Sequence, residues 1–133
     1  MPEKRTIERA RRDKREGKAP STQAGEFVRE EMDHIREGKH GARSTKQAIA
    51  IGLSKARRAG VPLKPPRSGQ ASVRTRKSAA SAYREGQSGR HKTSAKRSRA
   101  TLKALKREPH RAASHASLSR QARSTARRRN RAA

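Results

Sequence analysis

The feature that most constrains this chain is a positive charge that it cannot neutralise itself. Its 133 residues include 37 Lys and Arg against 11 Asp and Glu, a formal net charge of +26 at pH 7. Residues 1–66 hold 17 basic and 9 acidic residues, a net +8, whereas residues 67–133 hold 20 and 2, a net +18. A compact fold with this charge repels itself, so we expect the chain to stay open or to bind a polyanion. The partner that this charge predicts is nucleic acid. We expect DNA rather than RNA, a choice that charge and composition do not themselves decide.

The apolar content is too low to fill one ordinary domain. Hydrophobic residues make up 29% of the chain and aromatic residues 2%, and much of the apolar share is alanine. Burial stabilises by about 25 cal/mol per Å² of apolar surface, whereas ordering the backbone costs roughly 1–2 kcal/mol per residue. Low hydrophobicity with high net charge is typical of disorder. The composition therefore predicts a mainly α protein, with a small helical hairpin flanked by basic, largely disordered arms.

Two segments carry the pattern of amphipathic helices, at residues 22–37 and 45–59. In each, apolar residues recur at spacings of three and four, which places them on one helix face. Ser44 and Gln47 match a capping box at the start of the second segment, and Gly60 is placed to end it. The Gly-containing link between the segments allows a tight reversal. The predicted hairpin core is Phe27, Val28, Met32, Ile35, Ile49, Leu53 and Ala56.

Composition divides the rest of the chain around this hairpin. A charged arm with one short helix occupies residues 1–20, the hairpin domain residues 21–61, and a Pro-rich spacer residues 62–66. Residues 67–133 form a low-complexity tail of Arg, Lys, Ser and Ala. We expect this tail to be disordered alone and partly helical on DNA. The hairpin offers a surface for self-association or for a protein partner.

The tail carries the predicted binding chemistry. Each Lys or Arg that meets a phosphate releases counterions, so half of the tail's 20 basic residues would give a salt slope of roughly −9. The helix at 45–59 offers a weaker set for base reading, namely Thr45, Lys46, Ser54, Lys55 and Arg58. The predicted phosphate contacts are Arg74, Arg76, Lys77, Lys96, Arg97, Arg99, Lys103, Lys106, Arg107, Arg127, Arg128, Arg129 and Arg131.

Other functional classes find little support in the sequence. The chain has no cysteine, and its five histidines lack an HExxH or Cys/His pattern, so we expect no metal and no cofactor. It also lacks the GxxxxGK[ST] and GxSxG motifs, so we expect no enzyme. The N-terminus has no apolar signal region, and no apolar run approaches the ~20 residues of a membrane span. These features predict a cytoplasmic, nucleoid-associated protein with no membrane contact.

One stretch resembles a known family. Residues 46–60 read KQAIAIGLSKARRAG, and with the preceding EFVREEMDHIREGKHGARST they resemble small, basic, uncharacterised bacterial proteins. Those proteins share a K-Q-A-I-A-I-A-L-S-x-A-R-x-A-G signature, in which Gly52 of this chain replaces the usual Ala, at a cost to the helix of up to ~1 kcal/mol. The resemblance covers residues 20–62 and implies only a loose association with DNA binding. Separately, the tail is similar in composition to the arms of bacterial histone-H1-like proteins.

The predicted function is therefore non-enzymatic, mostly sequence-independent DNA binding, which would compact or bridge nucleoid or plasmid DNA by neutralising phosphates. Two alternatives remain open from composition alone. The first is a ribosome- or RNA-associated basic protein, and the second is an interaction adaptor whose hairpin binds a protein and whose tail localises it on nucleic acid.

Overall fold

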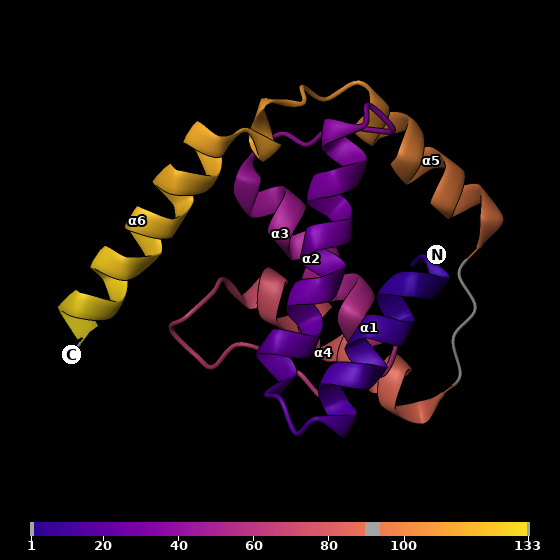
Figure 1. Ribbon diagram of the computed structural model, residues 1–133, viewed down its shortest axis with the longest axis vertical. Coiled ribbons are helices and arrows are strands. Elements are labelled where there is room, and N and C mark those ends of the chain that lie inside the picture. Colours follow the sequence, from indigo (N-terminus) through magenta and orange to yellow (C-terminus); the bar gives the residue numbers. More distant parts are fainter. Residues whose placement is uncertain (1, 90–93, 133) are drawn as a thin grey trace. The chain divides into compact units, whose positions relative to one another are not determined.

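The computed structural model of the chain describes residues 2–89 and 94–132 and is mainly helical (Figure 1). Within those ranges the β structure is limited to an isolated bridge between Ser68 and Ala71. Among the described residues, no helix combines the length and apolar character needed to cross a bilayer. The helices are α1 (Lys4–Arg15), α2 (Pro20–Arg36), α3 (Thr45–Arg58), α4 (Val73–Ser88), α5 (Ala95–Lys106), a 3-10 turn η1 (Arg111–Ala113) and α6 (His115–Ala132).

The chain forms two compact units, each built from two separate segments. Unit 1 contains residues 1–30 and 50–93, and unit 2 contains residues 31–49 and 94–133. Their limits fall inside α2 and α3, whereas the sequence analysis placed limits after residues 20, 61 and 66. Unit 1 carries 20 basic and 7 acidic residues, and unit 2 carries 17 and 4, so each has a net charge of +13. The difference in net charge between residues 1–66 and 67–133 therefore does not become a difference in net charge between the two units.

The prediction of a mainly α protein is confirmed, but the prediction of largely disordered arms is wrong. The N-terminal arm forms α1, which buries Thr6, Ala10 and Asp13. The tail forms α4, α5 and α6, and it buries alanines in α4 and in η1. The sequence estimate counted large apolar side chains, whereas these segments pack through small residues that let backbones approach closely. Residues 90–93 of the predicted tail, with His91, lie outside the described residues.

The core of unit 1 surrounds Phe27 of α2, whose side chain is 1% exposed. Ala10, Ala24, Ala56 and Val61 are buried with it, and Ile7, Leu53 and Leu63 pack against this cluster. Beside the cluster, the buried carboxylate of Glu30 accepts hydrogen bonds from the Thr6 hydroxyl at 3.0 Å and from the Glu3 N–H at 2.5 Å. A buried charge is tolerated when it is hydrogen-bonded in this way. This pair of contacts fixes α1 against α2.

Two glycines of unit 1 allow close backbone contact. A Cβ atom added to Gly52 of α3 would lie 2.6 Å from the Val28 Cα atom of α2, and one added to Gly86 of α4 would overlap the carbonyl oxygen of Arg57. By helix propensity alone, Gly52 is predicted to be a cost to its helix. In the structure, its missing side chain is what lets α3 approach α2.

Several predicted helix ends are confirmed. Gly60 has a φ of +100°, which favours glycine, and its N–H donates to the Arg57 carbonyl at 3.1 Å. The N–H of Val61 donates to the Ala56 carbonyl at 3.1 Å, which completes a Schellman motif. At the start of α3, the Ser44 hydroxyl accepts from the Gln47 N–H at 3.1 Å. The Gln47 side chain accepts from the Arg43 N–H at 2.6 Å, one residue earlier than a standard capping box.

The Pro-rich segment after α3 is held by one buried arginine. The guanidinium of Arg57 donates to the carbonyls of Leu63 and Lys64, at 3.1 and 3.3 Å. Burial lowers the pKa of Arg57. The side chain of Arg57 therefore secures the segment that leads from α3 towards α4.

Unit 2 joins the link between α2 and α3 to the backbone around η1. The N–H of Gly41 donates to the Leu105 carbonyl at 2.9 Å, and that of Ala42 donates to the Pro109 carbonyl at 3.0 Å. The Thr45 hydroxyl donates to the Ala112 carbonyl at 2.6 Å, and the Arg36 guanidinium donates to the Ala113 carbonyl at 3.1 Å. The buried apolar residues of this unit are Met32, Ile35, Ala42, Ala48, Ala112 and Ala113.

Candidate nucleic-acid interface

A basic pocket lies in unit 2, where the start of α3 meets η1 and α6. Its volume is about 380 Å³. Of the ten described residues that line it, four are Arg or Lys, four carry hydroxyls and none is acidic. The lining residues are Arg43, Ser44, Thr45, Lys46, Arg111, Ala112, Ser117, Arg120, Gln121 and Ser124.

Local hydrogen bonds hold the walls of this pocket in place. The bond from Thr45 to the Ala112 carbonyl ties the start of α3 to η1. The Ser114 hydroxyl accepts from the Ser117 N–H at 3.1 Å, which caps the start of α6. Both α3 and α6 therefore begin beside the pocket. The first turn of a helix carries N–H groups without helical partners and a partial positive charge, so both starts favour an anion there.

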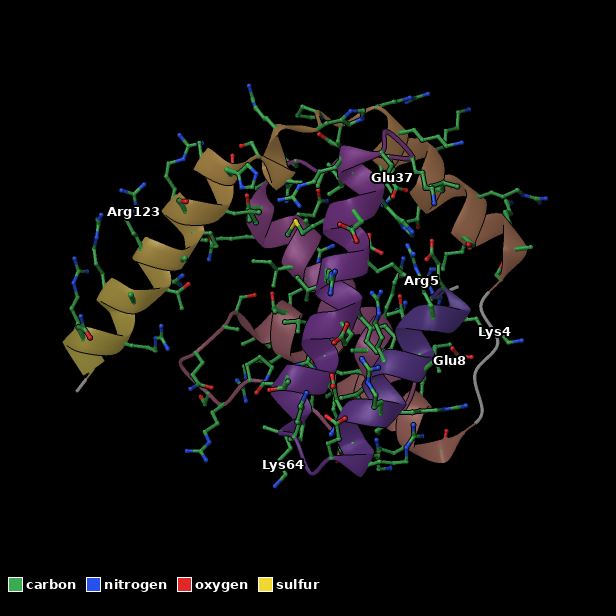
Figure 2. The ribbon with its side chains drawn as sticks, in the orientation of Figure 1. Lys4, Arg5, Glu8, Glu37, Lys64 and Arg123 are labelled. Atoms are coloured by element: carbon green, nitrogen blue, oxygen red, sulfur yellow. The ribbon has the colours of Figure 1, made fainter. Side chains whose placement is uncertain are left out.

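A row of arginines continues from the pocket along α6. Arg120, Arg123, Arg127 and Arg131 are spaced by three, four and four residues, which places them on one side of the helix. All four are exposed, and Figure 2 shows Arg123 projecting from α6. The first and last arginines of the row are 11 positions apart, or about 16 Å at the rise of an α-helix. We call these four residues the arginine row.

Hydrogen bonds within α6 orient the first two arginines of the row. The guanidinium of Arg120 donates to the Ser117 hydroxyl at 3.2 Å, and that of Arg123 donates to the Ser119 carbonyl at 3.4 Å. The sequence of α6 contains no acidic residue, so no carboxylate of this helix competes for these cations. The surface can therefore offer several positive charges to one polyanion.

The predicted phosphate contacts are divided between the two units. On α4 of unit 1, Arg74 and Lys77 are exposed, but Arg76 is half-buried. The other ten are all exposed and belong to unit 2. Lys96, Arg97, Arg99, Lys103 and Lys106 lie on α5, Arg107 follows it directly, and Arg127, Arg128, Arg129 and Arg131 lie on α6.

The candidates for base reading on α3 are mostly engaged elsewhere. Thr45 is buried against η1 through its hydrogen bond to the Ala112 carbonyl. Lys55 Nζ lies 3.9 Å from a Glu30 carboxylate oxygen, and Arg58 Nε lies 3.7 Å from one of Glu85. Thr45 and Lys46 of this set line the pocket, and of these two only Lys46 is exposed.

Sequence reasoning missed Arg43, Arg111, Arg120 and Arg123. The three-and-four spacing of arginines over residues 120–131 could have indicated the arginine row. No signal in the sequence connects Arg43 with Arg111, because the hydrogen bond from Thr45 to Ala112 joins positions 67 residues apart.

The described ion pairs show where unit 1 neutralises part of its charge. Lys18 Nζ lies 3.2 Å from an Asp13 oxygen and 3.1 Å from a Glu16 oxygen. The hydrogen bonds that Lys18 donates to Glu16 and then to Asp13 raise the pKa of Lys18. Arg5 lies 3.1 Å from Glu3 in the same unit. The net charges of the units are equal, but the pocket of unit 2 has cations without a carboxylate in its lining.

The aromatic residues do not offer a surface for stacking bases. The chain has one Phe, one Tyr and no Trp. Phe27 is buried in the core of unit 1, and Tyr83 is half-buried on α4. Recognition of single-stranded nucleic acid usually relies on exposed aromatic rings. Neither Phe27 nor Tyr83 is therefore a fully exposed platform for base stacking.

No protein-family model matches this chain, and neither the curated proteins nor the solved structures contain a significant match to it. The resemblance to small basic bacterial proteins therefore stays a prediction from the sequence.

Proposed function

We propose that this chain is a non-enzymatic protein that binds duplex DNA mostly without sequence preference. The basic pocket and the arginine row of unit 2 are its main contact with the phosphate backbone. In this proposal the protein acts on nucleoid or plasmid DNA, which it compacts or bridges by neutralising phosphates.

The observation that carries the proposal is the composition of the basic pocket. Arg43, Lys46, Arg111 and Arg120 surround a hollow at which two helices begin. Helix starts and guanidinium groups both favour phosphate oxygens. The arginine row extends this positive charge by about 16 Å, which suits a linear polyanion more than a single small anion.

Two further observations favour duplex DNA. A groove of B-form DNA admits an α-helix, whereas the major groove of duplex RNA is too narrow for side chains to read. The chain also lacks the exposed aromatic residues that single-stranded RNA sites use. Exposed cations on α4 of unit 1 and on α6 of unit 2 supply charge for more than one DNA segment.

The experiment measures binding to a labelled DNA duplex over a range of salt concentrations. Wild-type protein is compared with Arg111→Gln/Arg120→Gln, which removes two pocket charges. The matched control is Lys4→Gln/Lys64→Gln, which removes two exposed charges of unit 1 (Figure 2). We expect the pocket variant to make the slope of log K against log salt shallower by about 1.8, because each phosphate contact contributes about 0.9. We expect little change in the control.

An equal change of the salt slope in both double variants would contradict the pocket as the contact site. Binding would then depend on the net charge of the protein alone. Tighter binding to structured RNA than to duplex DNA at about 0.15 M salt would favour the RNA alternative. Unrelated duplex sequences are expected to bind with similar affinity, and a strong preference for one of them would contradict sequence-independent binding.

A further inference from the structure

The link between α2 and α3 brings three residues of metal-binding type together within unit 2. Glu31 and His34 are three residues apart on α2, so they lie on one helix face, and His40 comes from the link. One ligand atom from each of the three residues lies within 4.8 Å of the other two. This arrangement contains neither an HExxH motif nor a Cys/His pattern, so the motifs expected of a metal site do not reveal it in the sequence.

This cluster is largely withdrawn from water. Glu31 is 0% exposed and His40 is 5% exposed, whereas His34 is half-buried. A carboxylate in such a position requires a positive partner. The Glu31 Oε2 atom lies 3.1 Å from the His40 Nε2 atom, so this pair already brings an oxygen and a nitrogen ligand together.

The second nitrogen of His40 fixes its tautomer. Its Nδ1 atom lies 2.9 Å from the carbonyl oxygen of Gly41. A carbonyl oxygen only accepts, so Nδ1 carries a hydrogen and donates it. The Nε2 atom facing Glu31 is then the nitrogen left to hold a proton or a metal ion. In metal sites, a histidine ligand commonly donates its outer N–H to a backbone carbonyl in this manner.

The backbone around Gly41 is itself held in place. Its N–H donates to the Leu105 carbonyl at 2.9 Å, and an added Cβ atom would overlap the carbonyl of Glu108. The rings of His34 and His40 stand nearly perpendicular, with centroids 6.1 Å apart and an interplanar angle of 84°. The two imidazoles thus approach Glu31 from a helix and from an anchored link.

We propose that Glu31, His34 and His40 bind Zn²⁺ or a chemically similar divalent transition-metal ion. One carboxylate and two imidazoles suit zinc, and three protein ligands leave a fourth position for water. Tetrahedral zinc with ligands at about 2.0–2.1 Å sets its ligand atoms about 3.3 Å apart. The pair of Glu31 and His40 is close to that separation, at 3.1 Å. A His34 ring nitrogen lies within 4.8 Å of a ligand atom of each, so metal binding would require the His34 side chain to move closer.

Such an ion would join the end of α2 to the link that leads into α3. Arg43 and Ser44, at the end of that link, line the basic pocket. Metal binding would therefore stabilise unit 2 close to the proposed DNA contact. The metal site itself does not require the protein to bind DNA.

The test uses full-length protein without a histidine tag, freed of metal with a chelator. Zn²⁺ binding is measured by titration calorimetry, and Co²⁺ is used as a probe because its visible absorption reports four-coordinate binding. We expect one ion per chain. We expect His34→Gln and Glu31→Gln to weaken binding at least about tenfold, whereas His115→Gln and Glu37→Gln, both at exposed positions, retain it.

His34→Gln is the deciding variant because the His34 side chain is half-buried, so we expect its loss to disturb the fold less than loss of the buried Glu31 or His40. We expect Zn²⁺ to raise the melting temperature of wild type and of His115→Gln, but not that of a folded His34→Gln. Three results would each overturn the site: no Zn²⁺ or Co²⁺ uptake by wild type, unchanged binding in His34→Gln, or equal loss in His115→Gln.

Discussion

Helices α4 and α5 come from the same low-complexity stretch of sequence, yet they differ in how they pack. Both are rich in Arg, Lys, Ser and Ala, and both begin after a serine whose hydroxyl accepts a backbone N–H. Helix α4 buries Ala79 and Ala82, whereas none of the twelve residues of α5 is buried. Composition alone does not distinguish a packed helix from an exposed one.

The difference lies in the order of the small residues. In α4, Ala79, Ala82 and Gly86 recur at spacings of three and four, which makes one narrow face. Gly86 on that face meets the backbone of Arg57 and Gly60. Helix α5 has no glycine, and its Leu102 side chain is 43% exposed. In such chains, packing depends on how closely backbones can approach, more than on the size of apolar side chains.

The largest effect should come from filling the closest backbone contact of α4. We expect Gly86→Ala to lower the free energy of unfolding by about 3 kcal/mol, because the new Cβ atom would overlap the Arg57 carbonyl. The matched control is Gly25→Ala in α2, where a Cβ atom meets nothing within 4 Å. That control should raise stability by about 1 kcal/mol, as helix propensity dictates. Chemical denaturation measures the free energy of unfolding of both variants. A Gly86→Ala protein as stable as wild type would contradict the close backbone contact proposed for α4.

A larger side chain should distinguish the two helices next. Ala82 of α4 is 2% exposed, whereas Ala100 of α5 is exposed. We expect Ala82→Leu to lower the free energy of unfolding by about 2 kcal/mol through overpacking. We expect Ala100→Leu to change it by less than about 0.5 kcal/mol. Equal losses at both positions, measured by the same denaturation, would show that α5 is packed as tightly as α4.

Removing the capping hydroxyls should give the smallest difference. The Ser72 hydroxyl accepts from the Thr75 N–H at 3.2 Å, and the Ser94 hydroxyl accepts from the Arg97 N–H at 3.5 Å. Loss of a cap costs about 1 kcal/mol of helix stability. In Ser72→Ala we expect this loss in global unfolding, because α4 is part of a core. In Ser94→Ala we expect it mainly as faster amide exchange within α5. A global loss in Ser94→Ala would refute the distinction.

Local signals in the sequence predicted much of the helical structure. The spacing of apolar residues and the ends of the helices placed two of them at 22–37 and 45–59, and the structure has them at Pro20–Arg36 and Thr45–Arg58. The serine cap of α3 and the turn at Gly60 follow from backbone chemistry within a few residues. Such features are local, so a single sequence contains them. Of the predicted core, Phe27, Met32, Ile35 and Ala56 are buried, and Val28, Ile49 and Leu53 are half-buried.

The fold of the tail and the pocket depend on contacts between distant segments. Ala112 and Ala113 are buried, and their carbonyls accept hydrogen bonds from the side chains of Thr45 and Arg36. No sequence pattern around residue 112 predicts those partners. The cations of α5 and α6 could be named from charge alone. Their grouping with Arg43 and Lys46 could not, because it requires the three-dimensional course of the link after α2.

The interleaved segments of the two units also bear on how this chain must be assembled. In unit 2, residues 31–49 are synthesised well before residues 94–133, which complete the unit. In unit 1, residues 1–30 are likewise synthesised before residues 50–93. Each unit therefore closes a long loop before the contacts between its two segments can form, which slows folding and exposes incomplete surfaces during synthesis. Truncation at residue 66 would remove α4 from unit 1 as well as α5 and α6 from unit 2. A loss of the proposed DNA binding in such a fragment could not separate removal of the contact residues from unfolding of the units, so point substitutions are the cleaner way to dissect this protein.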